Sequence, residues 1–82
     1  MLVAAQIRAA RALLRWSAQK LADKSGVSWT TIQRMESAED VPSATAKSLK
    51  AIQDTLENSG VFFIDEDEEL GPGVRLRKTE EQ

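Results

Sequence analysis

The sequence predicts a mostly α-helical fold, a bundle of four to five helices followed by a C-terminal β-hairpin. Apolar residues recur every three to four positions through most of residues 1–58, which is the spacing of helices with one buried face. Ser17 and Ser28 are helix-capping residues and Gly26 is a helix-ending residue, so they divide this pattern into short helices. After Gly60 the pattern changes to short β-favouring runs separated by a turn.

A chain of 82 residues is the size of one small domain. Such a domain buries only about 60% of the surface of its unfolded chain, so its core is thin. The 41% hydrophobic and 29% charged residues are ordinary for a folded globular protein. We therefore expect a chain that folds and for which a second copy is a natural partner.

Cysteine and histidine are both absent from the sequence. Their absence excludes a disulfide framework, thiolate chemistry, a Cys/His zinc site and an imidazole base. The sequence also has no Gly-rich phosphate loop, no metal-ligand spacing and no nucleophile paired with a base. We expect a protein that is not an enzyme, with no catalytic residues and no metal or other cofactor.

The apolar opening of the chain is short. Gln6 and Arg8 interrupt it almost at once, so it is neither a signal peptide nor a membrane span. We expect a cytoplasmic protein with no membrane partner.

The net charge of -2 conceals a division of charge along the chain. Residues 1–34 carry six basic side chains and one acidic one, a balance of +5. Residues 35–82 carry five basic side chains and twelve acidic ones, a balance of -7. A chain divided in this way has one part suited to a polyanion and another that a polyanion would avoid.

The first helix is predicted over residues 4–15. Its apolar residues share one face, and three arginines share the neighbouring flank: Val3, Ile7, Ala10 and Leu14 on the first, Arg8, Arg11 and Arg15 on the second. The helix therefore places a basic stripe beside a core stripe.

Two short helices follow, separated by a tight turn. Ser17 is placed to cap the second helix and Gly26 to end it, and Ser28 is placed to cap a third helix over residues 29–37. Gly26, Val27 and Ser28 form the link. Two short helices joined by a three-residue turn with glycine describe a helix-turn-helix, in which the second of the two helices enters the DNA major groove.

The rest of the chain is predicted to be a loop, a helix and a hairpin. Pro42 and Ser43 mark the start of a helix that runs to Asn58. We expect a DNA-binding unit over residues 1–59, a β-hairpin over residues 60–78 and a tail over residues 79–82. Buried positions are predicted from the apolar spacing of all four helices, namely Ile7, Leu21, Ile32, Met35, Leu49, Ile52 and Leu56.

The predicted hairpin has apolar side chains on both faces. Val61 and Phe63 point one way, whereas Phe62 and Ile64 point the other. One face can lie on the helices, and the other face or the edge can pair with a second copy, so we expect a homodimer. The hairpin is the expected dimerisation element, with the fourth helix as the alternative. The acidic run over residues 65–69 is most simply a solvated loop.

The segment QIRAARALLRWSAQKLADKSGVSWTTIQRMES resembles the phage-repressor and Cro type of helix-turn-helix domain, the Xre family of transcriptional regulators. The resemblance covers residues 6 to about 57. It rests on the joint spacing of Ile7, Arg8, Arg11, Ser17, Leu21, Ala22, Gly26, Val27, Ser28, Ile32, Met35 and Glu36. It implies a repressor-like DNA-binding fold and sequence-specific binding to double-stranded DNA, usually as a dimer on a two-fold site.

The resemblance implies that Trp29, Thr30 and Arg34 meet base edges, with Gln33 beside them. The chemistry of these side chains agrees, because arginine can pair with guanine, glutamine with adenine, and threonine can touch a thymine methyl group. The alternative interpretation of Gln33 and Arg34 is an ordinary solvated helix face. Trp29 is an unusual residue at this position, and its ring can lie against DNA or fold back on the protein.

Phosphate contacts are predicted at the capped helix starts and on the basic side chains near them. Free N–H groups and the positive end of the helix dipole favour an anion at Ser17 and at Ser28. The other predicted phosphate contacts are Gln19, Lys20, Arg8 and Arg15. Domains of this type usually carry glutamine where this chain has Ala18, so Gln19 stands one position away from the expected place. Arg8, Arg15 and Lys24 are equally well interpreted as a solvated helix face.

Three residues are assigned structural roles through the resemblance. Arg11 and Glu36 are expected to form an ion pair, because such domains often link the first and third helices in this way. Trp16 is expected to pack into the core, since it occupies a position that is normally a buried leucine in this family.

We therefore predict a transcriptional regulator, a repressor, that places helix 29–37 in the major groove of a palindromic operator. The alternative is a protein-interaction module of the same fold, such as an antitoxin bound to its toxin or a coactivator. In that case Trp29, Phe62 and Phe63 would anchor the partner.

Overall fold

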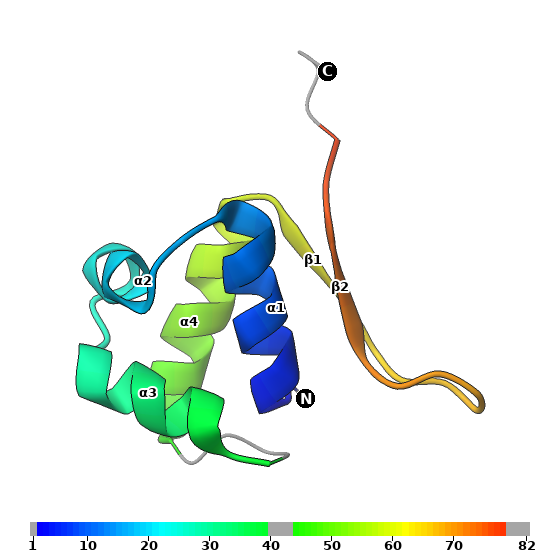
Figure 1. The fold of residues 1–82 in the computed structure, drawn as a ribbon, viewed down its shortest axis with the longest axis horizontal. Helices are drawn as coiled ribbons and strands as arrows, with labels where there is room; N and C mark the ends of the chain where they lie inside the picture. Colours follow the sequence, from blue (N-terminus) through cyan, green and yellow to red (C-terminus); the bar gives the residue numbers. More distant parts are fainter. Residues whose placement is uncertain (1, 40–43, 79–82) are drawn as a thin grey trace.

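The computed structural model describes residues 2–39 and 44–78 of the chain. These residues form four helices and one two-stranded antiparallel sheet (Figure 1): α1 (Ala4–Leu14), α2 (Ala18–Ser25), α3 (Trp29–Ser37), α4 (Ala46–Asn58), β1 (Val61–Ile64) and β2 (Gly73–Leu76). The predicted mostly helical fold with a C-terminal hairpin is confirmed, and the lower of the two predicted helix counts holds for the described residues. None of these helices is long and apolar enough to span a membrane.

Helix α1 begins and ends with specific main-chain contacts. Oε1 of Gln6 accepts a hydrogen bond from the N–H of Val3, 3.0 Å away, and so satisfies a donor at the start of the helix. Arg15, which the sequence placed in the helix, is its C-cap and adopts the left-handed conformation with φ of 59°. The N–H of Trp16 then donates to the carbonyl of Arg11 and closes the last turn.

The turn between α2 and α3 forms where the sequence predicts it. The hydroxyl of Ser17 accepts from the N–H of Lys20 at 3.0 Å, and the hydroxyl of Ser28 accepts from the N–H of Thr31 at 3.2 Å. Gly26 ends α2 with φ of 76°, a conformation that is unfavourable for residues with a Cβ atom. Caps within a few residues of each helix therefore define this part of the fold.

Helix α4 begins later than predicted. Its N-cap is Thr45, whose hydroxyl accepts from the N–H of Ser48 at 3.2 Å. The predicted start at Pro42 and Ser43 lies outside the described residues, three to four positions before the helix begins. A hydroxyl that bonds the third residue of the helix thus decides the boundary.

The core lies between the four helices and one face of the hairpin. Six of the seven predicted core residues are fully buried, namely Ile7, Leu21, Ile32, Met35, Ile52 and Leu56. Leu49 and Trp16 are partly buried against this cluster. Leu49 lies one turn before Ile52 on α4, toward the edge of the apolar stripe. The prediction from apolar spacing therefore overestimated the burial of Leu49.

The hairpin covers the helices with one face only. In its register Val61 lies opposite Leu76 and Phe63 opposite Val74. β1 packs against α4 and β2 against α1, so that Val61 is fully buried and Phe63 partly so. Phe62 is on the other face and remains 49% exposed. Figure 1 shows the turn of the hairpin projecting beyond the helices.

Gln6 joins the first helix to the hairpin. Its amide Nε2 donates to the carbonyls of Ile64 at 3.2 Å and Gly73 at 3.0 Å, while its Oε1 serves Val3. The residue is only 3% exposed, so these bonds form away from water. One buried amide thus satisfies both strands of the hairpin at the end of the ladder.

We predict that Gln6→Ala lowers the free energy of unfolding by about 1–3 kcal/mol, because it leaves buried carbonyl groups without a donor. Urea denaturation followed by circular dichroism measures this change. The control is Gln53→Ala on α4, where the amide makes only a 3.4 Å contact with Glu57 on the exposed surface. The control should change stability by no more than about 0.5 kcal/mol. Equal effects of the two variants would contradict the assigned role of Gln6.

Candidate nucleic-acid interface

Helix α3 has a buried side and an exposed leading edge. Ile32 and Met35 are fully buried in the core. Trp29, at the first position of the helix, is 49% exposed. Thr30 and Arg34 are also exposed, and Gln33 is half-buried. The four side chains predicted to meet bases therefore lie on one helix, which the core holds by its opposite side.

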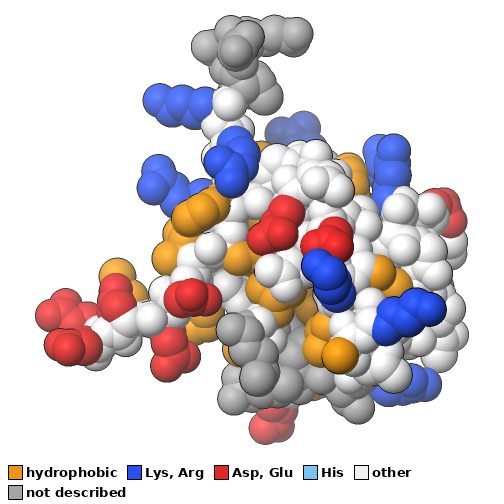
Figure 2. All heavy atoms as spheres, turned by 180° about the vertical axis from the view of Figure 1, so that it is seen from behind, with side chains coloured by type: hydrophobic (Ala, Val, Ile, Leu, Met, Phe, Trp, Pro, Cys, Tyr) orange, Lys and Arg blue, Asp and Glu red, His pale blue; other side chains and the backbone are white. Residues whose placement is uncertain are grey.

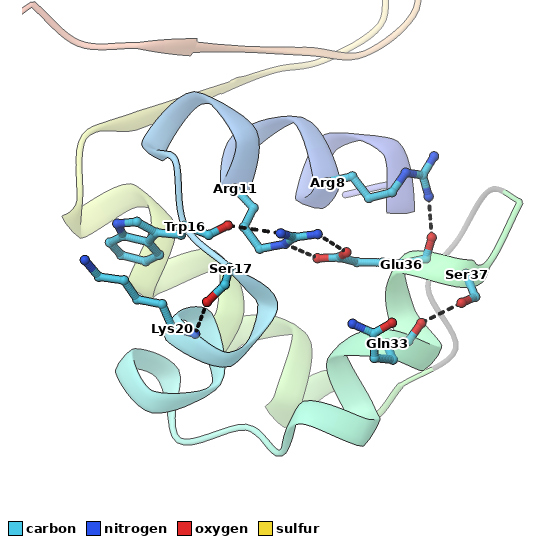
Figure 3. A network of polar contacts seen from close by, with 8 residues as sticks. All are labelled: Arg8, Arg11, Trp16, Ser17, Lys20, Gln33, Glu36 and Ser37. Carbon is cyan, nitrogen blue, oxygen red and sulfur yellow. Dashed lines mark hydrogen bonds and ion pairs between the residues drawn. The ribbon is translucent and has the colours of Figure 1, made fainter.

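The placement of α3 depends on Arg11 of α1. Its Nε donates to Oε2 of Glu36 at 2.9 Å and its Nη2 to Oε1 at 2.8 Å, a paired geometry that fixes the two planes together. A third bond runs from its Nη1 to the main-chain carbonyl of Trp16 at 3.0 Å. Figure 3 shows this guanidinium between α3 and the segment that leads into α2. One side chain thus fixes α3 relative to the start of α2.

This ion pair is largely shielded from water. The Glu36 side chain is 7% exposed and that of Arg11 is 24% exposed. Hydrogen bonding to Glu36 raises the pKa of Arg11 above its ordinary value, against the opposing effect of partial burial. Arg11 is therefore engaged within the protein, as the ion-pair interpretation required, and is not free to hold a phosphate.

Arg8 is also engaged within the protein. Its Nη1 donates to the main-chain carbonyl of Glu36, in the last turn of α3 (Figure 3). Ser28 caps the opposite end of this helix, roughly 12 Å away at 1.5 Å per residue. A cation at a helix C-terminus is favourable because the carbonyls there are unpaired. The structure thus supplies a structural role for Arg8 that the prediction of a phosphate contact did not include.

The start of α2 combines free donors with a positioned cation. The Ser17 hydroxyl serves as the cap, so an anion here would meet the main-chain N–H groups of the first turn. Nζ of Lys20 lies 5.6 Å from the centre of the Trp16 ring, at the outer limit of a cation–π contact (Figure 3). The partly buried ring therefore gives Lys20 a defined place near the helix start.

The remaining residues predicted to contact phosphate are exposed, and two of them already form hydrogen bonds within the protein. Nε2 of Gln19 donates to Oδ1 of Asp23 at 2.9 Å, so this amide already has a partner. The Ser28 hydroxyl donates to Oγ1 of Thr31 at 2.9 Å while it caps α3. Arg15 is exposed, at the turn between α1 and α2. The contacts of these residues with DNA stay predictions.

Sequence reasoning missed the role of Gln6 and the partner of Arg8. Both contacts join residues far apart in the chain, 58 and 67 positions for Gln6 and 28 for Arg8. The available signal for Gln6 was a glutamine one position before the fully buried Ile7, within a helix otherwise rich in alanine. A polar residue in such a position needs a partner, but the sequence does not show which one.

The helix-turn-helix family model HTH_3 matches residues 7–59, which is well over half of the chain. Among curated proteins and solved structures, none matches the chain significantly. The protein belongs to the Cro/C1-type helix-turn-helix family, the Xre family. Membership implies DNA binding, and domains of this family are typically not enzymes.

We predict that Glu36→Gln destabilises the fold by about 1–3 kcal/mol, because it removes the charge that Arg11 faces in a partly shielded site. Chemical denaturation measures the change. Glu39→Gln serves as the control, since Glu39 is an exposed carboxylate just beyond the same helix. If both variants unfold at the same denaturant concentration, Arg11 and Glu36 do not hold α3 in place.

Proposed function

We propose that this protein is a sequence-specific transcriptional regulator, a repressor, that inserts α3 into the major groove of double-stranded DNA. The observation that carries the proposal is the exposed edge of α3, with Trp29, Thr30 and Arg34 in solvent and Gln33 half-buried. A helix that is held by its buried side and presents several hydrogen-bonding groups on the other has the arrangement needed to read base edges.

Each of these side chains has a specific base that it suits. Arg34 can donate two hydrogen bonds to O6 and N7 of guanine, and Gln33 can pair with N6 and N7 of adenine. Thr30 can bond a base or touch a thymine methyl group. Trp29 offers one N–H donor and a large ring surface, which suits contact with a methyl group or a sugar at the groove wall. Each good bidentate pair discriminates between bases by about 1–3 kcal/mol.

The phosphate backbone would meet the helix starts beside this edge. The N-termini of α2 and α3, capped by Ser17 and Ser28, offer N–H groups to an anion. Lys20 and Arg15 add positive charge near the start of α2. Gln19 would join them if its amide turned from Asp23 to a phosphate oxygen.

We further propose that two copies bind a palindromic operator. A dimer with its two α3 helices about 34 Å apart would place them in successive major grooves on one side of the DNA. The protein would then repress transcription by occupying the promoter, because a dimer bound there excludes RNA polymerase. The exposed face of the hairpin favours that element over α4 as the contact between copies, since Phe62 is not covered by the helices.

A second candidate function is the protein-interaction module, with a toxin-type partner. The observation in its favour is that two large aromatic side chains, Trp29 and Phe62, are each 49% exposed. Phe63 is a weaker candidate as an anchor because it is partly buried against the core. The variant Phe62→Ala distinguishes the two functions. Loss of binding to a protein partner with intact DNA affinity supports the second function, whereas weakened dimerisation together with weakened operator binding supports the first.

We predict a steep dependence of DNA affinity on salt. If one copy neutralises four or five phosphates, log K falls with log salt at a slope of about -4, and at about twice that for a dimer. Fluorescence anisotropy with a duplex recovered by selection from random DNA measures this slope, and the selected sequence should show two-fold symmetry. A flat salt dependence, or no enrichment of any sequence, would contradict the proposed function.

We predict that Arg34→Ala weakens binding to the selected duplex by about 1–3 kcal/mol and relaxes the preference at one base pair. The control is Lys47→Ala, which removes an exposed positive charge from the start of α4. Lys47→Ala should leave the base preference unchanged. An unaltered preference in Arg34→Ala would show that this side chain does not read a base.

A further inference from the structure

The two ends of the hairpin carry opposite charges. Its turn carries five consecutive acidic residues over positions 65–69, all exposed. Its opposite end carries Arg75, Arg77 and Lys78, also exposed. Figure 2 shows acidic side chains gathered at the free end of the projecting hairpin and basic ones at its other end. Within the described part of the chain the ion pairs are Arg11–Glu36 and Lys50–Asp54, so the hairpin charges are not paired with each other.

The outer edge of β2 has main-chain groups available for pairing. The N–H of Arg77 donates to the carbonyl of Gly60 at 2.8 Å, which fixes the alternation of the ladder. By that alternation, the N–H and C=O groups of Val74 and Leu76 point away from β1. The described sheet contains only β1 and β2, so no described strand covers this edge. β2 is also the more exposed of the two strands.

We propose that β2 pairs antiparallel with β2 of a second copy, so that the acidic turn of each hairpin lies beside the basic end of the other. This interface is a specific form of the dimer proposed above, and its role in DNA binding rests on the proposed function. A parallel arrangement would bring two acidic turns together, whereas the two-fold antiparallel one forms the favourable contact twice. The charge pattern therefore selects a second copy in one orientation and closes the assembly at two.

The sequence of β2 and the residues before it also selects a register. Val74 is the central residue of the segment 71–77, which reads GPGVRLR. Two glycines precede Val74 and two arginines follow it, at matching distances. With Val74 opposite Val74 of the second copy, each arginine faces a glycine. A shift that places Arg75 opposite Arg75, or Arg75 opposite Arg77, sets like charges against each other, which is unfavourable.

Within the described residues, neither steric crowding nor a positive φ requires glycine at position 71 or 73. A Cβ atom on Gly71 would meet nothing within 4 Å, and one on Gly73 would meet only Cδ1 of Ile64 at 4.0 Å. Neither has the positive φ that favours glycine. The proposed register supplies a reason for both, because it places an arginine side chain of the second copy over each of them.

The first test reverses charges and measures association without DNA by sedimentation equilibrium. One variant carries Glu66→Lys, Glu68→Lys and Glu69→Lys in the turn, and the other carries Arg75→Glu and Arg77→Glu. Asp67 is kept because its carboxylate accepts from the N–H groups of Glu69 and Leu70 and shapes the turn. Those bonds lower the pKa of Asp67 below its ordinary value.

Each variant alone should dimerise at least about tenfold more weakly than the natural sequence, because its two hairpin ends now carry the same sign. An equal mixture of the two should form a heterodimer. A charge-matched control, Lys24→Glu with Lys47→Glu, alters exposed lysines outside the hairpin and should leave dimerisation unchanged. A monomeric natural sequence, or dimerisation that the hairpin variants do not weaken, would overturn the proposal.

The second test identifies the register in the folded protein. The chain contains no cysteine, so a single Val74→Cys variant offers one thiol per copy. Residues opposite each other at a hydrogen-bonded pair are about 5.5 Å apart between Cα atoms, within reach of a disulfide. Val74→Cys should cross-link under mild oxidation and the matched Leu76→Cys should not. Cross-linking of Leu76→Cys alone would overturn the register.

The failure of this interface and the failure of the proposed function are separable. Dimers that respond to the hairpin charges but do not bind DNA would support the interface and reject the regulator. Salt-dependent DNA binding by a protein that stays monomeric would support the regulator and reject the interface.

Discussion

The presentation of α3 depends on the guanidinium of Arg11. It bonds both carboxylate oxygens of Glu36 on α3 and the carbonyl of Trp16 just before α2. Among the described residues, α2 and α3 are otherwise connected by a short turn and by apolar packing, which tolerates small rotations. Planar paired hydrogen bonds are directional, so they restrict the angle at which the exposed edge of α3 faces the solvent. Base readout requires that restriction, because a bidentate contact tolerates little displacement.

Helix α1 is the element through which the other parts are connected. Arg11 joins it to α3, Arg8 reaches the last turn of the same helix, and Gln6 joins it to both strands of the hairpin. The apolar stripe of α1, with Ile7 and Ala10 fully buried, adds the packing between these polar links. The helix that we propose reads DNA, α3, and the strand that we propose pairs two copies, β2, both contact the short helix α1. In the proposed dimer, these contacts would set the position of each α3 relative to the two-fold axis of the operator.

Local signals made most of the fold predictable. Ser17, Gly26 and Ser28 define helix ends through bonds to residues within four positions, so the sequence carries that information directly. The pairing of Arg11 with Glu36, which the family resemblance implied, is present in the structure. The long-range polar contacts that the resemblance does not include were not predictable, because nothing near Gln6 in the chain indicates that its amide meets Ile64 and Gly73. The turning of Gln19 toward Asp23 is a choice between partners that only the structure shows.

We propose that the leading edge of α3, together with the start of α2, is the surface that meets DNA. Titration of isotope-labelled protein with a selected duplex, followed by NMR of the amide and indole N–H groups, tests it most directly. We expect the largest shifts on the Trp29 indole, on the amides of residues 28–34 and on those at the start of α2. Large shifts confined to α4 or to the hairpin, with the Trp29 indole unchanged, would contradict it.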